Sequence, residues 1–170
     1  FKCPPVADGE ALMRQDIVAD MACDLLLGDS SPLYQRLYDA GLINGSFGGG
    51  FDQLPGIAYL YAGGDSDQPE EVVRAILDEA QRLAREGVSE EFYQQIRRAS
   101  FGSTLRALNS FENIAVSLAD GTFRGFDPFH FPEVYDSVTR ADVETFLRES
   151  VVAERSALSI LIPKKEGASQ

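Results

Sequence analysis

The residues that could do metal or nucleophilic chemistry are few in this chain. It contains one histidine, His130, which stands between two phenylalanines, and two cysteines, Cys3 and Cys23, far apart in the sequence. A catalytic zinc site needs three or four nitrogen, sulfur or oxygen ligands, often two histidines and an acid at helical spacing. No Gly-x-Ser-x-Gly elbow is present to supply a serine nucleophile. We therefore expect no catalytic residue, no metal ligand and no cofactor in this chain.

The glycine run Gly48-Gly49-Gly50 is the second feature that could bind a ligand. A phosphate-binding loop would continue with Gly-Lys-Ser/Thr and a helix, and neither follows. Glycines weaken a strand but permit another backbone to approach closely. The run therefore favours a strand at which a second segment makes contact, with a bulge or a buried strand as the alternative. The acidic turn 65–67 lacks the later ligands of a calcium loop, so we interpret it as a solvated turn and helix cap.

Hydrophobic periodicity gives the elements that must position these residues. Apolar spacing predicts helices from Glu10 to the glycine at 28, from Ser31 to the glycine at 41, from about 68 to 87, from Ser89 onward, from 109 or 110 to about 121, and after Thr139. Strands are predicted within 43–51, at 57–62 and at 157–162, with another cut off at Phe1 and an aromatic loop at 123–132. This order indicates a single α+β domain over residues 1–170, with a small antiparallel or mixed sheet and helices packed on one face.

Composition excludes several classes of function. Lys and Arg number 15 against 27 Asp and Glu, which gives a net charge of −12. That charge disfavours nucleic acid and anionic membranes as partners and would suit a cationic one. No apolar run approaches the roughly 20 residues of a membrane span. The two unpaired-looking cysteines indicate a reducing compartment, and with no visible signal peptide we expect a cytoplasmic protein that is a piece of a longer chain.

Two stretches resemble a known family. SSPLYQRLYDAGLINGSF (30–47) resembles the helix-to-strand passage of M16 (insulinase/pitrilysin-type) peptidase domains. DQPEEVVRAILDEAQRLAREGVSEEFYQQIRRA (67–99) resembles the helix, turn and second helix that follow in that family. The resemblance runs from about residue 11 to 163. Within this range the chain is similar in particular to the C-terminal domain of bacterial two-domain members of the family. It implies the LuxS/MPP-like metallohydrolase type of α+β domain.

The resemblance also implies a division of labour. M16 enzymes pair homologous domains around a peptide-holding chamber, and one domain carries the HxxEH zinc motif, which this chain lacks. The partner implied is a catalytic M16 domain holding the zinc, in the same chain or in another subunit. Tyr38 and Asn44 stand at positions where related halves carry a substrate-gripping Arg and Tyr, with Arg36 nearby. We therefore expect peptide or partner contacts at Arg36, Tyr38, Asn44, Gly48, Gly49 and Gly50.

Two functions follow from the resemblance, and a third does not depend on it. The chain is expected to be the zinc-free, substrate-enclosing C-terminal half of an M16 zinc metallopeptidase that hydrolyses peptides. The alternative is a catalytically inactive M16-like subunit that acts in assembly or peptide binding. An unrelated α+β binding module is the third possibility.

Overall fold

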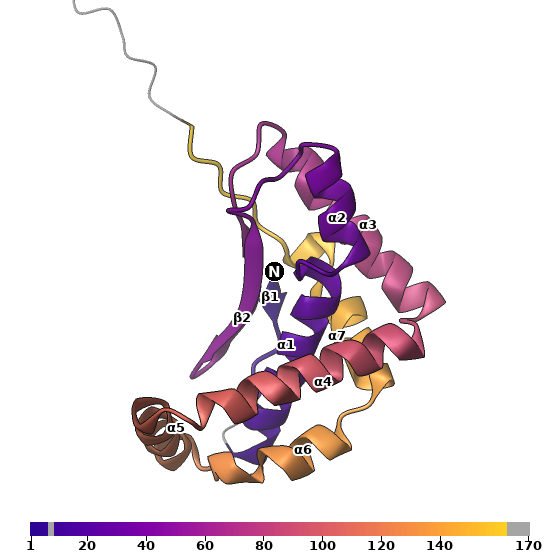
Figure 1. The fold of residues 1–170 in the computed structure, drawn as a ribbon. Helices are drawn as coiled ribbons and strands as arrows, with labels where there is room; N and C mark the ends of the chain where they lie inside the picture. The colour runs from indigo at the N-terminus through magenta and orange to yellow at the C-terminus, as the bar shows by residue number, and fades with distance from the viewer. Residues whose placement is uncertain (7–8, 163–170) are drawn as a thin grey trace, which may run out of the picture.

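The computed structural model describes residues 1–6 and 9–162 (Figure 1). Helices dominate and a small sheet lies against them. In chain order the elements are β1 (Lys2–Cys3), α1 (Glu10–Leu27), α2 (Pro32–Asp39), β2 (Gly48–Leu54), β3 (Ile57–Gly63), α3 (Pro69–Glu86), α4 (Glu90–Ala107), α5 (Phe111–Arg124), α6 (Phe131–Ser137) and α7 (Arg140–Ser150), with 3₁₀ turns at Pro128–His130 and Ala153–Arg155.

The helix boundaries follow the capping residues. The Ser31 hydroxyl accepts a hydrogen bond from the backbone N–H of Tyr34 at 3.1 Å, with Pro32 as the first helical residue. Ser89 does the same for α4, and Thr139 with Asp142 forms a complete capping box at α7. The predicted helix starts are confirmed at these positions.

The sheet is antiparallel, with strand order β1-β3-β2. β2 and β3 form the predicted hairpin, in which Phe51 lies opposite Leu60. The hairpin turns at Gly56, whose φ of 79° is a conformation that glycine adopts without strain. β1 pairs with β3 at only two positions.

The core lies between one face of the sheet and the helices. Met21, Leu25 and Leu26 of α1 are fully buried beneath the sheet, and so is Leu60 of β3. Tyr59 and Tyr61 alternate with buried residues of β3 and lie exposed on the opposite face. In Figure 1 the helices gather on one side of β2, so the α+β class and the one-sided helix layer are confirmed.

The aromatic loop predicted at 123–132 is wrong in part. Helix α5 continues past Gly121 to Arg124, and α6 begins at Phe131. Gly121 lies inside α5 and does not end it. A glycine there allows close packing, since a Cβ would lie 2.6 Å from the carbonyl oxygen of Phe126. Gly125, with a φ of 75°, caps the helix instead.

The strand predicted at 157–162 is also wrong. These residues form no ladder with the sheet among the described parts of the chain. A cavity of about 320 Å³ separates Ser156–Ser159 from β3, so the distance to β3 exceeds that of hydrogen-bonded strands. High β-propensity alone does not make a strand without a neighbour to accept its hydrogen bonds.

Candidate peptide-contact surface

A groove lies between α1, the glycine end of β2 and α4. It consists of two adjoining cavities of about 340 and 410 Å³, which share Cys23, Asp24, Gly49 and Ala99. We call it the glycine groove. Its other lining residues are Asp20, Leu27, Gly28, Asp29, Ser30, Gly48, Gly50, Ile96, Ser100, Ser103 and Thr104.

The α1 wall of the glycine groove is acidic. Asp20 and Asp24 are one helical turn apart, and Asp16 lies one turn before them. Asp20 is an exposed residue, yet partial loss of water at its carboxyl, and then the charges of Asp16, Asp24 and Asp52, raise its pKa to about 7. Burial also raises the pKa of Asp24. A cation entering the groove would relieve this repulsion.

The free edge of β2 borders the glycine groove. Among the described residues β2 pairs only with β3, so its other edge has no strand neighbour. An unpaired edge presents backbone N–H and C=O groups to which an extended peptide can add. Gly48 leaves this edge uncrowded, because a Cβ there would meet nothing within 4 Å.

Gly49 and Gly50 have packing reasons to lack side chains. A Cβ on Gly49 would lie 2.5 Å from Leu27 Cδ1 and 2.6 Å from the carbonyl oxygen of Tyr61. A Cβ on Gly50 would lie 2.7 Å from the Tyr61 hydroxyl, because that ring extends across β2. The close approach expected at the glycine run is therefore made, at these two positions, by α1 and β3.

Arg36 joins α2 to α3 instead of standing free. Its guanidinium donates to Glu79 Oε2 at 2.9 Å, while Arg82 donates to both oxygens of the same carboxylate. Glu79 is only 4% exposed. The hydrogen bonds from Arg82, and then from Arg36, hold the pKa of Glu79 below its usual value.

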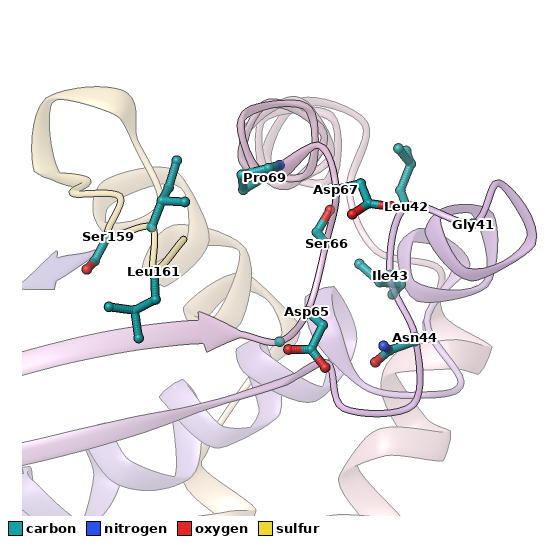
Figure 2. Close-up of a pocket in the computed structure, with 12 residues that line it drawn as sticks. Gly41, Leu42, Ile43, Asn44, Asp65, Ser66, Asp67, Pro69, Ser159 and Leu161 are labelled. Carbon is teal, nitrogen blue, oxygen red and sulfur yellow. The ribbon is translucent and has the colours of Figure 1, made fainter. Parts of the chain in front are cut away.

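Tyr38 and Asn44 lie in two further places. Tyr38 is exposed on α2, stacked on Tyr34 with ring centroids 6.1 Å apart. The Asn44 side chain accepts a hydrogen bond from the N–H of Ser46 and lines a cavity of about 510 Å³ beside Asp65 (Figure 2). The expected contact residues therefore fall into three groups: the glycines in the groove, Asn44 in this cavity, and Arg36 with Tyr38 on α2.

Comparison with known proteins decides the family. Residues 9–100, more than half of the chain, match the family described as the Peptidase M16 inactive domain. The chain belongs to this M16 family. It is 28% identical over 160 residues to the uncharacterized zinc protease YmfH of Bacillus subtilis (strain 168), covering 94% of this chain and 37% of that protein. The chain thus spans little more than a third of its curated relative.

Solved structures show the same fold. A protein from Alicyclobacillus acidocaldarius assigned as an M16-like peptidase matches with a TM-score of 0.81 and 23% identity, over 88% of this chain and 36% of that one. The inactive peptidase domain of a protein assigned as a zinc protease in Bordetella parapertussis matches with a TM-score of 0.80 and 17% identity. That match covers 99% of this chain and 91% of the other.

This M16 inactive domain has no zinc-type site in its described part. Across residues 1–6 and 9–162, no three His, Cys, Asp or Glu residues lie together as metal ligands would. Cys3 and Cys23 are both buried free thiols, and burial raises the pKa of Cys23 to about 12. A thiol with that pKa stays protonated and unreactive near neutral pH.

No helix in the described part of the chain combines the length and apolar character that crossing a membrane requires.

Sequence reasoning missed the acidic wall of the glycine groove in this M16 domain. A signal was present, because Asp16, Asp20 and Asp24 recur every four residues and therefore share one side of α1. The apolar face of α1 was identified from the same spacing. The orientation of the acidic side toward β2 and α4 depends on tertiary packing, which periodicity does not give.

Proposed function

We propose that this domain is the zinc-free half of an M16 peptidase that encloses its peptide substrate together with a catalytic M16 domain. The catalytic domain, in the same chain or in a partner subunit, would hold the zinc and hydrolyse the peptide. The observation that carries this proposal is the glycine groove, an acidic channel along an unpaired strand edge in a domain of this family. We further infer a cytoplasmic, bacterial protein.

The peptide contact would be made mainly by backbone at β2. An extended peptide adds to an open edge through main-chain hydrogen bonds, and side-chain pockets supply selectivity. Asp20 and Asp24 on the α1 wall favour peptides that carry Lys or Arg. Because Gly48 has open space around it, the peptide backbone can approach β2 there.

Helix α5 offers a surface for pairing with the catalytic domain. Phe111 and Phe123 of this helix are 91% and 88% exposed. Val116 and Leu118 are also exposed on α5. Several large apolar side chains exposed on one helix favour an interaction site in a soluble protein.

The experiment is to fill the groove in the complete protein, catalytic domain included. Ala99 is exposed on α4 and lines both cavities, so Ala99→Trp would occupy the groove without changing a residue of the sheet. We expect KM for a basic fluorogenic peptide to rise about tenfold with kcat unchanged, the pattern of lost ground-state binding. Ala141→Trp, at an exposed position of α7 away from the groove, is the matched control and should leave KM unchanged.

Three results would decide between the alternatives. An unchanged KM for Ala99→Trp in a folded protein would remove the groove as the contact. A complete protein that binds the peptide, measured by fluorescence anisotropy, but never hydrolyses it would favour the inactive subunit that acts in binding or assembly. Stoichiometric zinc in this domain alone would contradict its zinc-free role.

A further inference from the structure

The glycine groove adjoins a smaller cavity at one end. This cavity, of about 190 Å³, lies between α1, the C-terminal end of α4, α5 and α6 (Figure 1), and we call it the apolar pocket. Thr104 of α4 lines both the apolar pocket and the glycine groove. On α1, Asp16 and Ile17 of the pocket lie about one turn before Asp20 of the groove. The two spaces therefore adjoin along both helices.

The apolar pocket differs from the groove in the side chains that line it. Its buried lining residues are Met13, Ile17, Phe131 and Tyr135. Ala107, at the end of α4, lines the pocket and is exposed, so the pocket opens to solvent there. A cavity of about 150 Å³ with apolar walls holds a benzene ring. The volume of the apolar pocket, about 190 Å³, therefore suits a single side chain such as Phe, Leu or Met.

Strand β2 reaches from the acidic wall of the groove to the apolar pocket. Near the start of β2, a Cβ on Gly49 would meet Leu27 at the C-terminal end of α1. Near the end of β2, Gln53 donates hydrogen bonds to the Leu12 carbonyl oxygen at 3.0 Å and to the Asp16 carboxylate. The strand thus runs along α1 in the opposite direction. A peptide added to the free edge of β2 would pass the acidic wall and reach the apolar pocket.

Asp20 and Asp24 are available to such a peptide, whereas Asp16 is already engaged. The Asp16 carboxylate accepts the hydrogen bond from Gln53. The pKa of both Asp20 and Asp24 is raised, and no hydrogen bond or cation among the described residues lowers it. A Lys or Arg of a bound peptide would supply the opposite charge.

We propose that the apolar pocket is a specificity subsite that takes one Phe, Leu or Met of the bound peptide, and that the same peptide places a Lys or Arg at Asp20 or Asp24. This inference rests on the proposed function, since it needs the peptide to lie along β2 in the glycine groove. It adds a second side chain by which this domain selects its substrate.

The geometry of α1 sets the spacing between the two peptide side chains. The α1 residues of the pocket are Met13, Asp16 and Ile17. At a rise of about 1.5 Å per residue, their centre lies about 7 Å along the helix from Asp20 and about 13 Å from Asp24. An extended peptide advances about 3.3 Å per residue, so two and four residues span these distances, and both spacings put the two side chains on one side of the peptide. The apolar residue should therefore lie two or four positions from the basic one.

The test measures peptide binding by fluorescence anisotropy to the complete protein with its catalytic zinc site disabled. The probes are labelled Gly/Ser/Thr peptides with one Arg and one Phe, one to five positions apart, and each has a control in which Ala replaces Phe. Both orders of Arg and Phe are made, because an edge accepts a parallel or an antiparallel strand. In one order, separations of two and four should bind at least about tenfold more tightly than their Ala controls, whereas odd separations should gain less than about threefold.

A variant of α4 locates the Phe side chain. Ala107→Trp would fill the apolar pocket, and Ala141→Trp on α7 is the matched control. We expect Ala107→Trp to remove the gain from Phe and to leave the affinity for the Ala peptides unchanged. The control should alter neither. Ala99→Trp should weaken binding of both kinds of peptide, because it fills the groove.

The outcomes separate this inference from the proposed function. If Ala99→Trp weakens binding but Phe gives no gain, or the same gain at every separation, the groove holds the peptide and the apolar pocket is not a subsite. A gain from Phe that survives Ala107→Trp would place that side chain elsewhere and overturn the inference. If Ala99→Trp changes no affinity, the proposed function fails, and this inference fails with it.

Discussion

The two edges of the sheet are surrounded by different chemistry. The β2 edge borders the glycine groove, where Asp20 and Asp24 face the serines and threonine of α4. On the other side of β3, beyond β1, lies a cavity of about 320 Å³ lined by Val72 and Ile76 of α3 and by Ser156–Ser159. A polar, charged edge suits a ligand that comes and goes in water, while apolar surface suits a lasting contact.

The three glycines at the β2 edge also differ in why a side chain is absent. On the β2 edge, Gly49 and Gly50 make room for Leu27 and Tyr61, which are parts of the fold. Gly48, one residue away, has no such neighbour. The proposed peptide contact and the packing role therefore fall on different glycines of the same run, and mutations can separate them.

The largest effect is expected at Gly49. In Gly49→Val the new side chain would collide with the Leu27 side chain and the Tyr61 backbone, and the backbone would have to move. We expect a loss of about 2–3 kcal/mol in unfolding free energy by urea denaturation. Gly48→Val, with open space, should change it by less than about 0.5 kcal/mol. Equal losses at both positions would contradict the distinction drawn between them.

The next largest change in unfolding free energy is expected at Glu79 of α3. Glu79→Ala would leave two arginines without their shared carboxylate and should cost about 2 kcal/mol near pH 7. Because the pKa of Glu79 is lowered on folding, its stabilisation is present above the unfolded value of 4.5 and is lost as pH falls through the folded value.

Urea denaturation of Glu79→Ala and of the unmodified chain at pH 7 and pH 3 measures this pH dependence. The difference between their unfolding free energies should be smaller at pH 3. Arg36→Ala is the companion variant. The Arg36 side chain is 58% exposed, so its loss should cost no more than about 1 kcal/mol. A larger loss for Arg36→Ala than for Glu79→Ala would be inconsistent with Glu79 as the centre of the cluster.

A smaller effect, of opposite sign, is expected in the groove, because Asp20 is an exposed residue and water screens its charge. The pKa of Asp20 is raised to about 7 from 3.8, so the folded state loses stability as pH rises from 3.8 to about 7. Asp20→Asn removes this penalty and should be more stable than the unmodified chain at pH 8, with the gain vanishing near pH 3.5. NMR titration of the carboxyl gives the pKa directly. A pKa near 4 would mean that the groove wall is not electrostatically strained.

The smallest effect is expected on α5. Phe111→Ser and Phe123→Ser replace side chains that are about nine-tenths exposed, so the unfolding free energy of this chain should change by less than about 0.5 kcal/mol. In the complete protein the same pair should weaken association with the catalytic domain, measured by interdomain cross-linking yield. Unchanged cross-linking would remove α5 as the pairing surface.

Local sequence signals predicted most of the fold. Ser31, Ser89 and Thr139 mark helix starts because capping is a short-range interaction, and the hairpin follows from its glycine turn. The prediction of a strand at 157–162 was wrong because strand pairing depends on a neighbouring segment, which sequence periodicity does not reveal. The position of α6 was missed although Phe131, Val134 and Tyr135 have helical spacing, because the helix is only 7 residues long and has a proline at its start.

The candidate site was harder to predict. Its glycines were identified as a contact strand, but the structure gives Gly49 and Gly50 packing partners within the domain. Arg36 was expected to be available for a peptide, whereas its guanidinium is shared with Glu79, 43 residues further along the chain. Partners at that separation are set by the packing of α2 on α3, not by local pattern.

The most direct measurement is hydrogen exchange on the complete protein, with its catalytic zinc site disabled, before and after addition of a basic peptide. We predict slower exchange at the amides of β2, from Gly48 to Asp52, with no change at Tyr61–Gly63 of β3. Protection confined to α2 or to Tyr61–Gly63, or no protection in this domain at saturating peptide, would contradict the claim that the glycine groove holds the substrate.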